Sequence, residues 1–143
     1  MAESFSGEVP SLRARILLAD DHQLVLERVT RLLQSAFDVV GAAHDGQEMV
    51  EQAMRLMPDV IVTDISMPGL SGLEAVHQLH ALGRSVPIIF LSVHNSPEFV
   101  EACLAEGALG FVTKSQMRRD LIPAINAALS GRSYISAEGR PKV

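Results

Sequence analysis

Short apolar runs alternate with stretches of helical periodicity along this chain. Runs at 15–19, 38–43, 59–64, 87–92 and 109–113 are rich in Ile, Val, Leu, Phe and Ala, and four of them are nearly continuous, as strands buried on both faces require. Between them, apolar residues recur at spacings of three and four, which places them on one face of a helix. The clearest examples are Val25, Val29, Leu32, Leu33 and Ala36; Leu73, Val76, Leu79 and Leu82; and Leu121, Ile125, Ala128 and Leu129. This alternation predicts an α/β fold, a doubly wound (βα)5 parallel sheet of flavodoxin type with strand order 2-1-3-4-5.

Residues with special roles at helix ends support the same boundaries. The sequence Ser71-Gly-Leu-Glu74 has the spacing of a capping box, and Ser96-Pro97 offers an N-cap followed by proline at the first helical position. Gly83 and Gly107 fall where helix C-termini require a left-handed residue. We therefore expect helices to begin after Ser71 and Ser96 and to end near these two glycines.

The chain is predicted to contain one domain with short extensions. Its 143 residues, 48% of them hydrophobic, are enough for one aliphatic core, in which Trp is absent. Residues 1–14, rich in Ser, Glu and Gly, predict a mobile leader. The domain is expected over 15–131, and residues 132–143, which lose helical periodicity, are expected to begin an interdomain linker.

Charge and hydropathy exclude several classes of partner. A net charge of -5 argues against binding nucleic acid or an anionic membrane by charge alone. No apolar run is long enough to span a membrane, the first ten residues lack the features of a signal peptide, and the single Cys103 excludes an internal disulfide. We expect a cytoplasmic protein with no membrane partner.

Charged residues stand at the ends of three of the predicted strands. Asp20 and Asp21 follow the first run, Asp64 ends the third, and Lys114 ends the fifth. Because parallel strands present their carboxyl ends at one edge of a sheet, these side chains should meet where open α/β folds bind ligands. Three carboxylates facing one lysine are unfavourable unless a cation joins them. The set is suited to holding a divalent metal and a transferred phosphoryl group.

Four motifs in this order give the chain a specific resemblance. They are LADDH at 18–22, DISMPGLSG at 64–72, LS at 91–92 and GFVTK at 110–114. On these motifs, the stretch from about Arg15 to Gly131 resembles the receiver domain of bacterial two-component response regulators, within the NarL/FixJ class. Each motif falls at the end of a predicted strand, so together they are far more specific than an isolated Asp-Asp pair.

The resemblance implies a role for each charged residue. Asp64 is the expected phosphoacceptor, since a carboxylate is a nucleophile that needs no base at neutral pH. Mg²⁺ (or Mn²⁺), which prefers oxygen ligands, is expected on Asp21 and Asp64 directly, on Asp20 through water, and on the backbone carbonyl of Ser66. Lys114 is expected to pair with Asp64 at rest and with the phosphoryl oxygens afterwards.

Two further residues are expected to transmit the signal. By the resemblance, the hydroxyl of Ser92 turns toward the phosphoryl group, and the ring of Phe111 occupies the space that it leaves. Related chains often carry Tyr at this position, and Phe111, which lacks the hydroxyl, is expected to lie inward even without phosphate. Ser115 also departs from the pattern, because many receivers have a cis proline there.

The same resemblance implies partners. A sensor histidine kinase is the expected phosphodonor, and transcription is the expected output, through a C-terminal helix-turn-helix domain beyond Val143 that alone binds DNA. Weak self-association is expected, as a homodimer through the face formed by the fourth helix, fifth strand and fifth helix. Apart from its own phosphorylation and dephosphorylation, the chain is not expected to be an enzyme.

Each residue also has an ordinary structural interpretation. Asp20 and Asp21 could cap a helix, Asp64 could begin a turn, Ser92 could bond to the backbone, Lys114 could be solvated, and Phe111 could be plain core. Their convergence at one sheet edge favours the functional interpretation. The five histidines lack metal-ligand spacing and are expected to have surface or packing roles, with His94 overhanging the site.

Three other classes of protein share features with such a signalling switch. A dehalogenase-like phosphatase would carry its nucleophile on the first strand and need a cap, and a flavodoxin-like redox protein would need a phosphate loop after that strand. A degenerate receiver that serves only as an interaction module is the stronger alternative. The intact set of Asp20, Asp21, Asp64, Ser92 and Lys114 counts against it.

Overall fold

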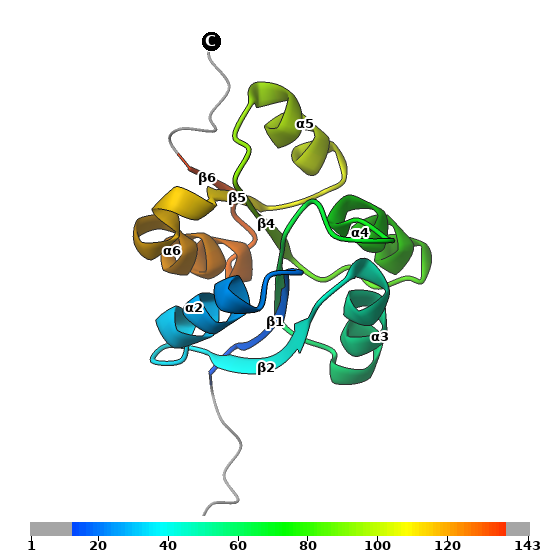
Figure 1. Ribbon diagram of the computed structural model, residues 1–143, viewed down its shortest axis with the longest axis horizontal. Coiled ribbons are helices and arrows are strands. Elements are labelled where there is room, and N and C mark those ends of the chain that lie inside the picture. Colours follow the sequence, from blue (N-terminus) through cyan, green and yellow to red (C-terminus); the bar gives the residue numbers. More distant parts are fainter. Residues whose placement is uncertain (1–12, 137–143) are drawn as a thin grey trace, which may run out of the picture.

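The five apolar runs form neighbouring parallel strands at the centre of the molecule (Figure 1). The computed structural model describes residues 13–136. The sheet has the order β2-β1-β3-β4-β5-β6, so the predicted order 2-1-3-4-5 is confirmed, and a sixth strand is added at the β5 edge. The strands are β1 (Arg15–Ala19), β2 (Asp38–Ala43), β3 (Val60–Thr63), β4 (Ile88–Ser92), β5 (Gly110–Thr113) and β6 (Tyr134–Ile135).

Helices cover both faces of this sheet, as the doubly wound prediction requires. They are α2 (Gln23–Leu33), α3 (Gly46–Leu56), α4 (Gly72–Ala81), α5 (Pro97–Ala105) and α6 (Met117–Leu129), with a short 3-10 turn, η1 (Lys114–Gln116), before α6. Figure 1 shows α2 and α6 on one side and α3, α4 and α5 on the other. None of the helices within residues 13–136 is long and apolar enough to cross a membrane.

The alternation of side chains along the strands divides the core into two clusters. Ile16 and Leu18 point into the cluster beneath α2 and α6, whereas Leu17 and Ala19 point into the cluster beneath α3, α4 and α5. The second cluster also holds the fully buried Cys103, and this burial raises the pKa of its thiol to about 12. Strands that bury both faces explain why the apolar runs are nearly continuous.

The predicted helix boundaries are confirmed. At the start of α4 the amide of Glu74 donates to Ser71 Oγ over 3.1 Å, and the amide of Ser71 donates to Glu74 Oε1 over 2.9 Å, completing the capping box. Ser96 caps α5, with Pro97 at its first position. Gly83 and Gly107 end α4 and α5 with φ angles of 81° and 93°, in the left-handed region that favours glycine.

The structure departs from the sequence prediction at both ends of the domain. Tyr134 and Ile135, expected to lie in a linker, pair with Gly110 and Phe111 as β6. Without them β5 would be an edge strand with unpaired backbone groups, and two residues are too few to reveal a strand by periodicity. At the other end, the carbonyl of Ala14 accepts from the Asp38 amide over 2.9 Å, so the fold begins before the predicted boundary. The rest of the leader (1–12) and of the linker (137–143) lies outside the described residues.

Candidate functional site

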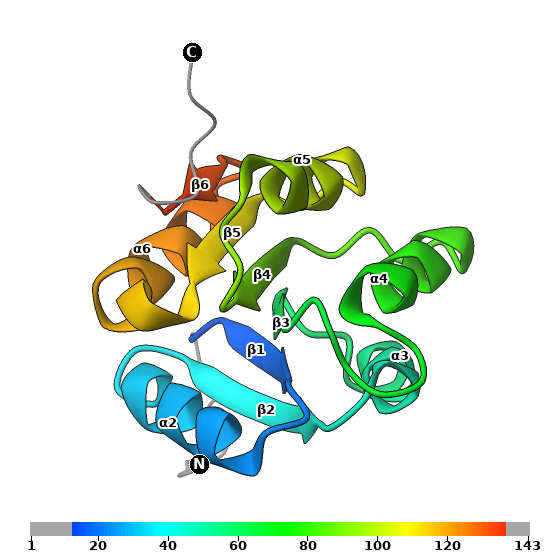
Figure 2. The same cartoon turned by 45° about the horizontal axis from the view of Figure 1, so that its top comes forward.

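Parallel pairing brings the predicted charged residues to one end of the sheet. Ala19 is in register with Thr63, and the amide of Asp64 donates to the carbonyl of Ala19 over 2.9 Å, which sets Asp64 beside Asp20. Lys114 directly follows β5, and Figure 2 shows the ends of β1, β3, β4 and β5 in one sheet. The site thus forms where the sequence predicted it.

Lys114 lies between two buried carboxylates. Its Nζ is 2.7 Å from Asp20 Oδ2 and 3.2 Å from Asp64 Oδ2, and only the second contact has hydrogen-bond geometry. Asp20 Oδ2 is therefore a buried oxygen that accepts no hydrogen bond within the part of the chain that the structure describes. It is compensated by charge alone, through the Lys114 ammonium, which it shares with Asp64.

The electrostatics of the site reflect this shortage of positive charge. Burial raises the pKa of Asp64, the charge of Lys114 opposes the rise, and the neighbouring carboxylate of Asp20 adds to it, so the pKa lies above its ordinary value. Burial lowers the pKa of Lys114, but its close contact with Asp20 and the charges of both carboxylates outweigh burial, and the pKa is raised. Lys114 therefore stays protonated, but its single positive charge does not bring the pKa of Asp64 back to the ordinary value.

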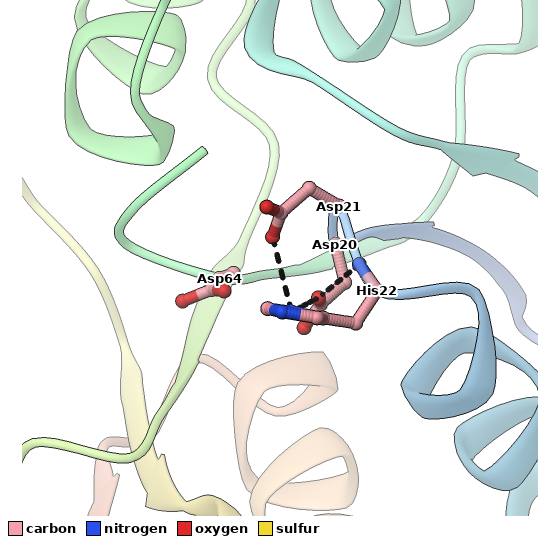
Figure 3. A group of neighbouring side chains, drawn as sticks. All are labelled: Asp20, Asp21, His22 and Asp64. Atoms are coloured by element: carbon pink, nitrogen blue, oxygen red, sulfur yellow. Dashed lines mark hydrogen bonds and ion pairs between the residues drawn. The ribbon is translucent and has the colours of Figure 1, made fainter. Parts of the chain in front are cut away.

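The same carboxylates form a group that could hold a metal ion. Figure 3 shows Asp20, Asp21, His22 and Asp64, each of which offers a ligand atom within 4.8 Å of the others. Carboxylate oxygens are the ligands that Mg²⁺ and Mn²⁺ prefer, and Asp20 and Asp64 share the charge of one lysine, which is consistent with an additional cation. The residues present therefore fit the divalent ion that the sequence predicted.

His22 is the member of this group that sequence reasoning placed elsewhere. Its Nδ1 lies 3.3 Å from Asp20 Oδ1 and 3.2 Å from Asp21 Oδ1, although its side chain is 69% exposed. In the sequence, the signal for its place in the group was that His22 directly follows the two aspartates. The fold of the β1–α2 turn decides which way its ring points. Figure 3 shows the ring alongside the carboxylates.

The turn also excludes helix capping by Asp20 and Asp21. The N-cap of α2 is His22, and among the described residues no side chain caps this end. Asp20 Oδ1 instead accepts from the amide of His22 over 2.9 Å. This bond fixes one oxygen of Asp20 in the turn and leaves the other, Oδ2, facing Lys114.

The loop after β3 closes tightly beside Asp64. The amide of Ser66 donates to Asp64 Oδ1 over 3.3 Å, and the amide of Gly72 donates to the carbonyl of Ile65 over 2.7 Å. A Cβ atom at Gly72 would overlap the carbonyl oxygen of Asp64, so only glycine permits this closure. The motif contains Gly72, but its contact with Asp64 was not predicted. The role predicted for the Ser66 carbonyl stays a prediction.

The two predicted switch residues are both buried. Ser92 Oγ accepts from the amide of His94 over 3.0 Å, so its structural interpretation holds in this state. The ring of His94 stacks on Phe99 with centroids 5.0 Å apart, beside the loop that Ser92 begins. Phe111 is fully buried in the cluster beneath α3, α4 and α5, which is the inward position expected of it. The movement of either side chain stays a prediction.

Comparison with known proteins identifies the family. The sequence pattern of the response regulator receiver domain matches residues 16–126, and the chain belongs to this family. It is 38% identical over 125 residues to the nitrate/nitrite response regulator protein NarL of Escherichia coli K12, covering 86% of this chain and 58% of NarL. It is 36% identical over 138 residues to the transcriptional regulatory protein DegU of Brevibacillus brevis, covering 95% of this chain and 57% of DegU.

A solved structure supports the same assignment. A two-component response regulator of the LuxR family from Aurantimonas sp. superimposes with a TM-score of 0.85 and 33% identity, covering 89% of this chain and 92% of that one. These neighbours place the chain among receivers of the NarL type. The chain spans less than three fifths of the length of NarL or DegU.

Proposed function

We propose that the chain is a phosphorylation-dependent switch in which Asp64 accepts a phosphoryl group from a sensor histidine kinase. The observation that carries the proposal is the position of the Asp64 carboxylate, 3.2 Å from the Lys114 ammonium and inside a group of oxygens that could hold a metal. The raised pKa indicates that one lysine, shared with Asp20, does not fully compensate the burial of the Asp64 carboxylate. An added cation and an electrophilic phosphorus would therefore stabilise this carboxylate more than one whose oxygens are fully hydrogen-bonded.

The proposed reaction is a phosphoryl transfer between two side chains. An oxygen of ionised Asp64 attacks phosphorus and forms an O–P bond while the P–N bond to the kinase histidine breaks, and the imidazole leaves with the electron pair of that bond. Lys114 is already hydrogen-bonded to Asp64 Oδ2. As negative charge develops on the phosphoryl oxygens, its ammonium group would move to contact them and stabilise that charge. The Ser66 amide, on Oδ1, orients the carboxylate.

The carboxylates of Asp20, Asp21 and Asp64, with the carbonyl of Ser66, would hold Mg²⁺ or Mn²⁺. When bound, the ion neutralises the carboxylates and lets an anionic phosphodonor approach. Asp20 would contribute a buried carboxylate whose Oδ2 forms an ion pair with the Lys114 ammonium and accepts no hydrogen bond within residues 13–136. The chain itself supplies the nucleophile, its orientation and the lysine.

The output that we propose is control of transcription. DegU is a transcriptional regulatory protein and the structural neighbour is of the LuxR family, which supports this proposal, and NarL and DegU both extend well beyond the matched part. DNA would be bound through a domain outside residues 1–143, and the acidic receiver would instead form a homodimer through α5, β5 and α6. The DNA-binding domain, the homodimer and the cytoplasmic location are parts of this proposal.

Intact-mass spectrometry after treatment with acetyl phosphate tests the phosphoacceptor. The wild-type chain should gain the mass of one phosphoryl group with Mg²⁺ and not with excess chelator, and Asp64→Asn should gain none. Asp38→Asn is the matched control, because it makes the same substitution at the opposite end of the sheet, where β2 begins, and should label as the wild type does. Labelling of Asp64→Asn at the same site, or equal labelling in chelator, contradicts the proposal.

A further inference from the structure

His22 lies on the solvent side of the group of side chains that could hold a metal ion. The side chains of Asp20 and Asp64 are only 4% and 11% exposed, and both contact the Lys114 ammonium. The side chains of Asp21 and His22 are 30% and 69% exposed. The group therefore has a buried side, which the lysine occupies, and an exposed side that carries Asp21 and His22.

The β1–α2 turn brings the ring of His22 to the aspartates. The amide of His22 donates to Asp20 Oδ1 over 2.9 Å, which ties the start of α2 back to the end of β1. The ring nitrogen Nδ1 lies 3.3 Å from Asp20 Oδ1 and 3.2 Å from Asp21 Oδ1 (Figure 3). His22 is the N-cap of α2, but its side chain forms no capping hydrogen bond. Helix capping therefore does not explain where the ring lies.

These separations are close to those of neighbouring ligands around one ion. In an octahedral site with bonds of about 2.1 Å, ligands at right angles lie about 3 Å apart and opposite ligands about 4.2 Å apart. Asp20, Asp21, His22 and Asp64 each offer an atom within 4.8 Å of the others. The ring nitrogen of His22 is therefore close enough to be one ligand of a set whose other members are carboxylate oxygens.

The same contacts have a simpler interpretation, which predicts the opposite effect on metal binding. A ring with a proton on Nδ1 would donate it to Asp20 Oδ1 and would occupy an oxygen that an ion needs. Removal of such a ring would leave the binding of a cation unchanged or strengthen it. Removal of a ring that is itself a ligand would weaken binding, so the sign of the change separates the two interpretations.

We propose that Nδ1 of His22 is a ligand of the divalent ion and makes the site favour a transition ion such as Mn²⁺ over Mg²⁺. The inference rests on the divalent ion of the proposed function and names which of the two ions the site holds more tightly. Mg²⁺ prefers oxygen ligands and loses its waters reluctantly, whereas transition ions also accept an imidazole nitrogen. Carboxylates alone would separate the two ions less, because both ions bind oxygen well.

Electron paramagnetic resonance of the complete chain, with Mn²⁺ alone and with Mg²⁺ as competitor, tests the proposal. The solution signal of free Mn²⁺ gives the dissociation constants of both ions, and electron spin echo modulation detects a nitrogen bound to Mn²⁺. The measurement is made at pH 8, because only an unprotonated ring nitrogen binds a metal. The wild type should show nitrogen modulation, and His22→Ala should lose it. His22→Ala should also bind Mn²⁺ about tenfold more weakly, with a change of less than about twofold for Mg²⁺.

His44→Ala is the matched control. His44 is also an exposed histidine, and its Nδ1 lies 3.0 Å from Glu48 Oε1, but it is not a member of the group that could hold the ion. This variant should keep the nitrogen modulation and both dissociation constants.

Several results would overturn the proposal alone. They are Mn²⁺ bound to the wild type without nitrogen modulation, modulation that persists in His22→Ala, and Mn²⁺ binding by His22→Ala that is unchanged or tighter. An equal loss of affinity for both ions would also overturn the stated preference. If the wild type binds neither ion, the metal of the proposed function is refuted together with this inference.

Discussion

Asp64 and Asp120 are both buried carboxylates, and they differ in how fully their oxygens are satisfied. Asp120 accepts four hydrogen bonds, and its pKa is lowered to about 2. Asp64 shares one lysine with Asp20, whose Oδ2 accepts no hydrogen bond among the described residues, and burial raises the pKa of Asp64. The two buried carboxylates thus behave in opposite ways, because the donors around each decide whether it holds a fold together or stays available for a ligand.

The largest effect that separates the two sites is on stability. Asp120→Ala should lower the free energy of unfolding by about 3 kcal/mol, because it leaves the buried Ser136 hydroxyl and its neighbours without their acceptor. Asp64→Asn should raise that free energy, because it removes a charge that burial disfavours. Urea unfolding followed by circular dichroism measures both. Equal destabilisation by the two substitutions would show that the sites do not differ as described.

A smaller difference should appear as the pH falls. The folded pKa of Asp120, about 2, lies below its ordinary value of 3.8, so the ionised group stabilises the fold above pH 3.8. This contribution, about 2 kcal/mol at neutral pH, should disappear as the pH falls through the folded pKa. The wild type and Asp120→Asn should therefore converge in unfolding free energy toward pH 2. A constant difference between them from pH 7 to pH 2 would contradict the assignment.

The smallest of these effects is stabilisation by a divalent cation. At tenfold excess over its dissociation constant, Mg²⁺ should stabilise the wild type by about 1.4 kcal/mol, because it binds only the folded site. Asp21→Asn should lose much of this gain, whereas Asp120→Asn should keep it although it starts from a lower melting temperature. Thermal melts with Mg²⁺ or with chelator make the comparison. If Mg²⁺ still stabilised Asp21→Asn but no longer stabilised Asp120→Asn, the ion would bind near Asp120 and not at the candidate site.

The parts predicted from sequence are those with a repeating or local signal. The apolar runs fixed the strand order, and the capping box at Ser71 fixed the start of α4. The positions of Asp20, Asp64 and Lys114 followed because each adjoins a strand end in a parallel sheet. The metal and phosphoryl roles of these residues remain predictions that geometry supports.

The parts that sequence missed depend on contacts between distant segments. Tyr134 and Ser136 reach Asp120 from 14 and 16 residues away, in a stretch whose composition indicated a linker. His22 approaches the aspartates because of a turn whose geometry the residue types do not determine. Neither arrangement carries a periodicity, and so both required the folded structure.

The burial of Cys103 has a practical consequence. It is the only cysteine of the chain, it lies on the buried face of α5, and burial raises the pKa of its thiol to about 12. Since the thiolate is the reactive form, maleimides and thiol-specific spin labels should leave the native protein unmodified near neutral pH. A cysteine introduced on the exposed surface would then be labelled alone, without first removing the natural one. The receiver is ready for single-molecule fluorescence or paramagnetic distance measurements with its own core intact.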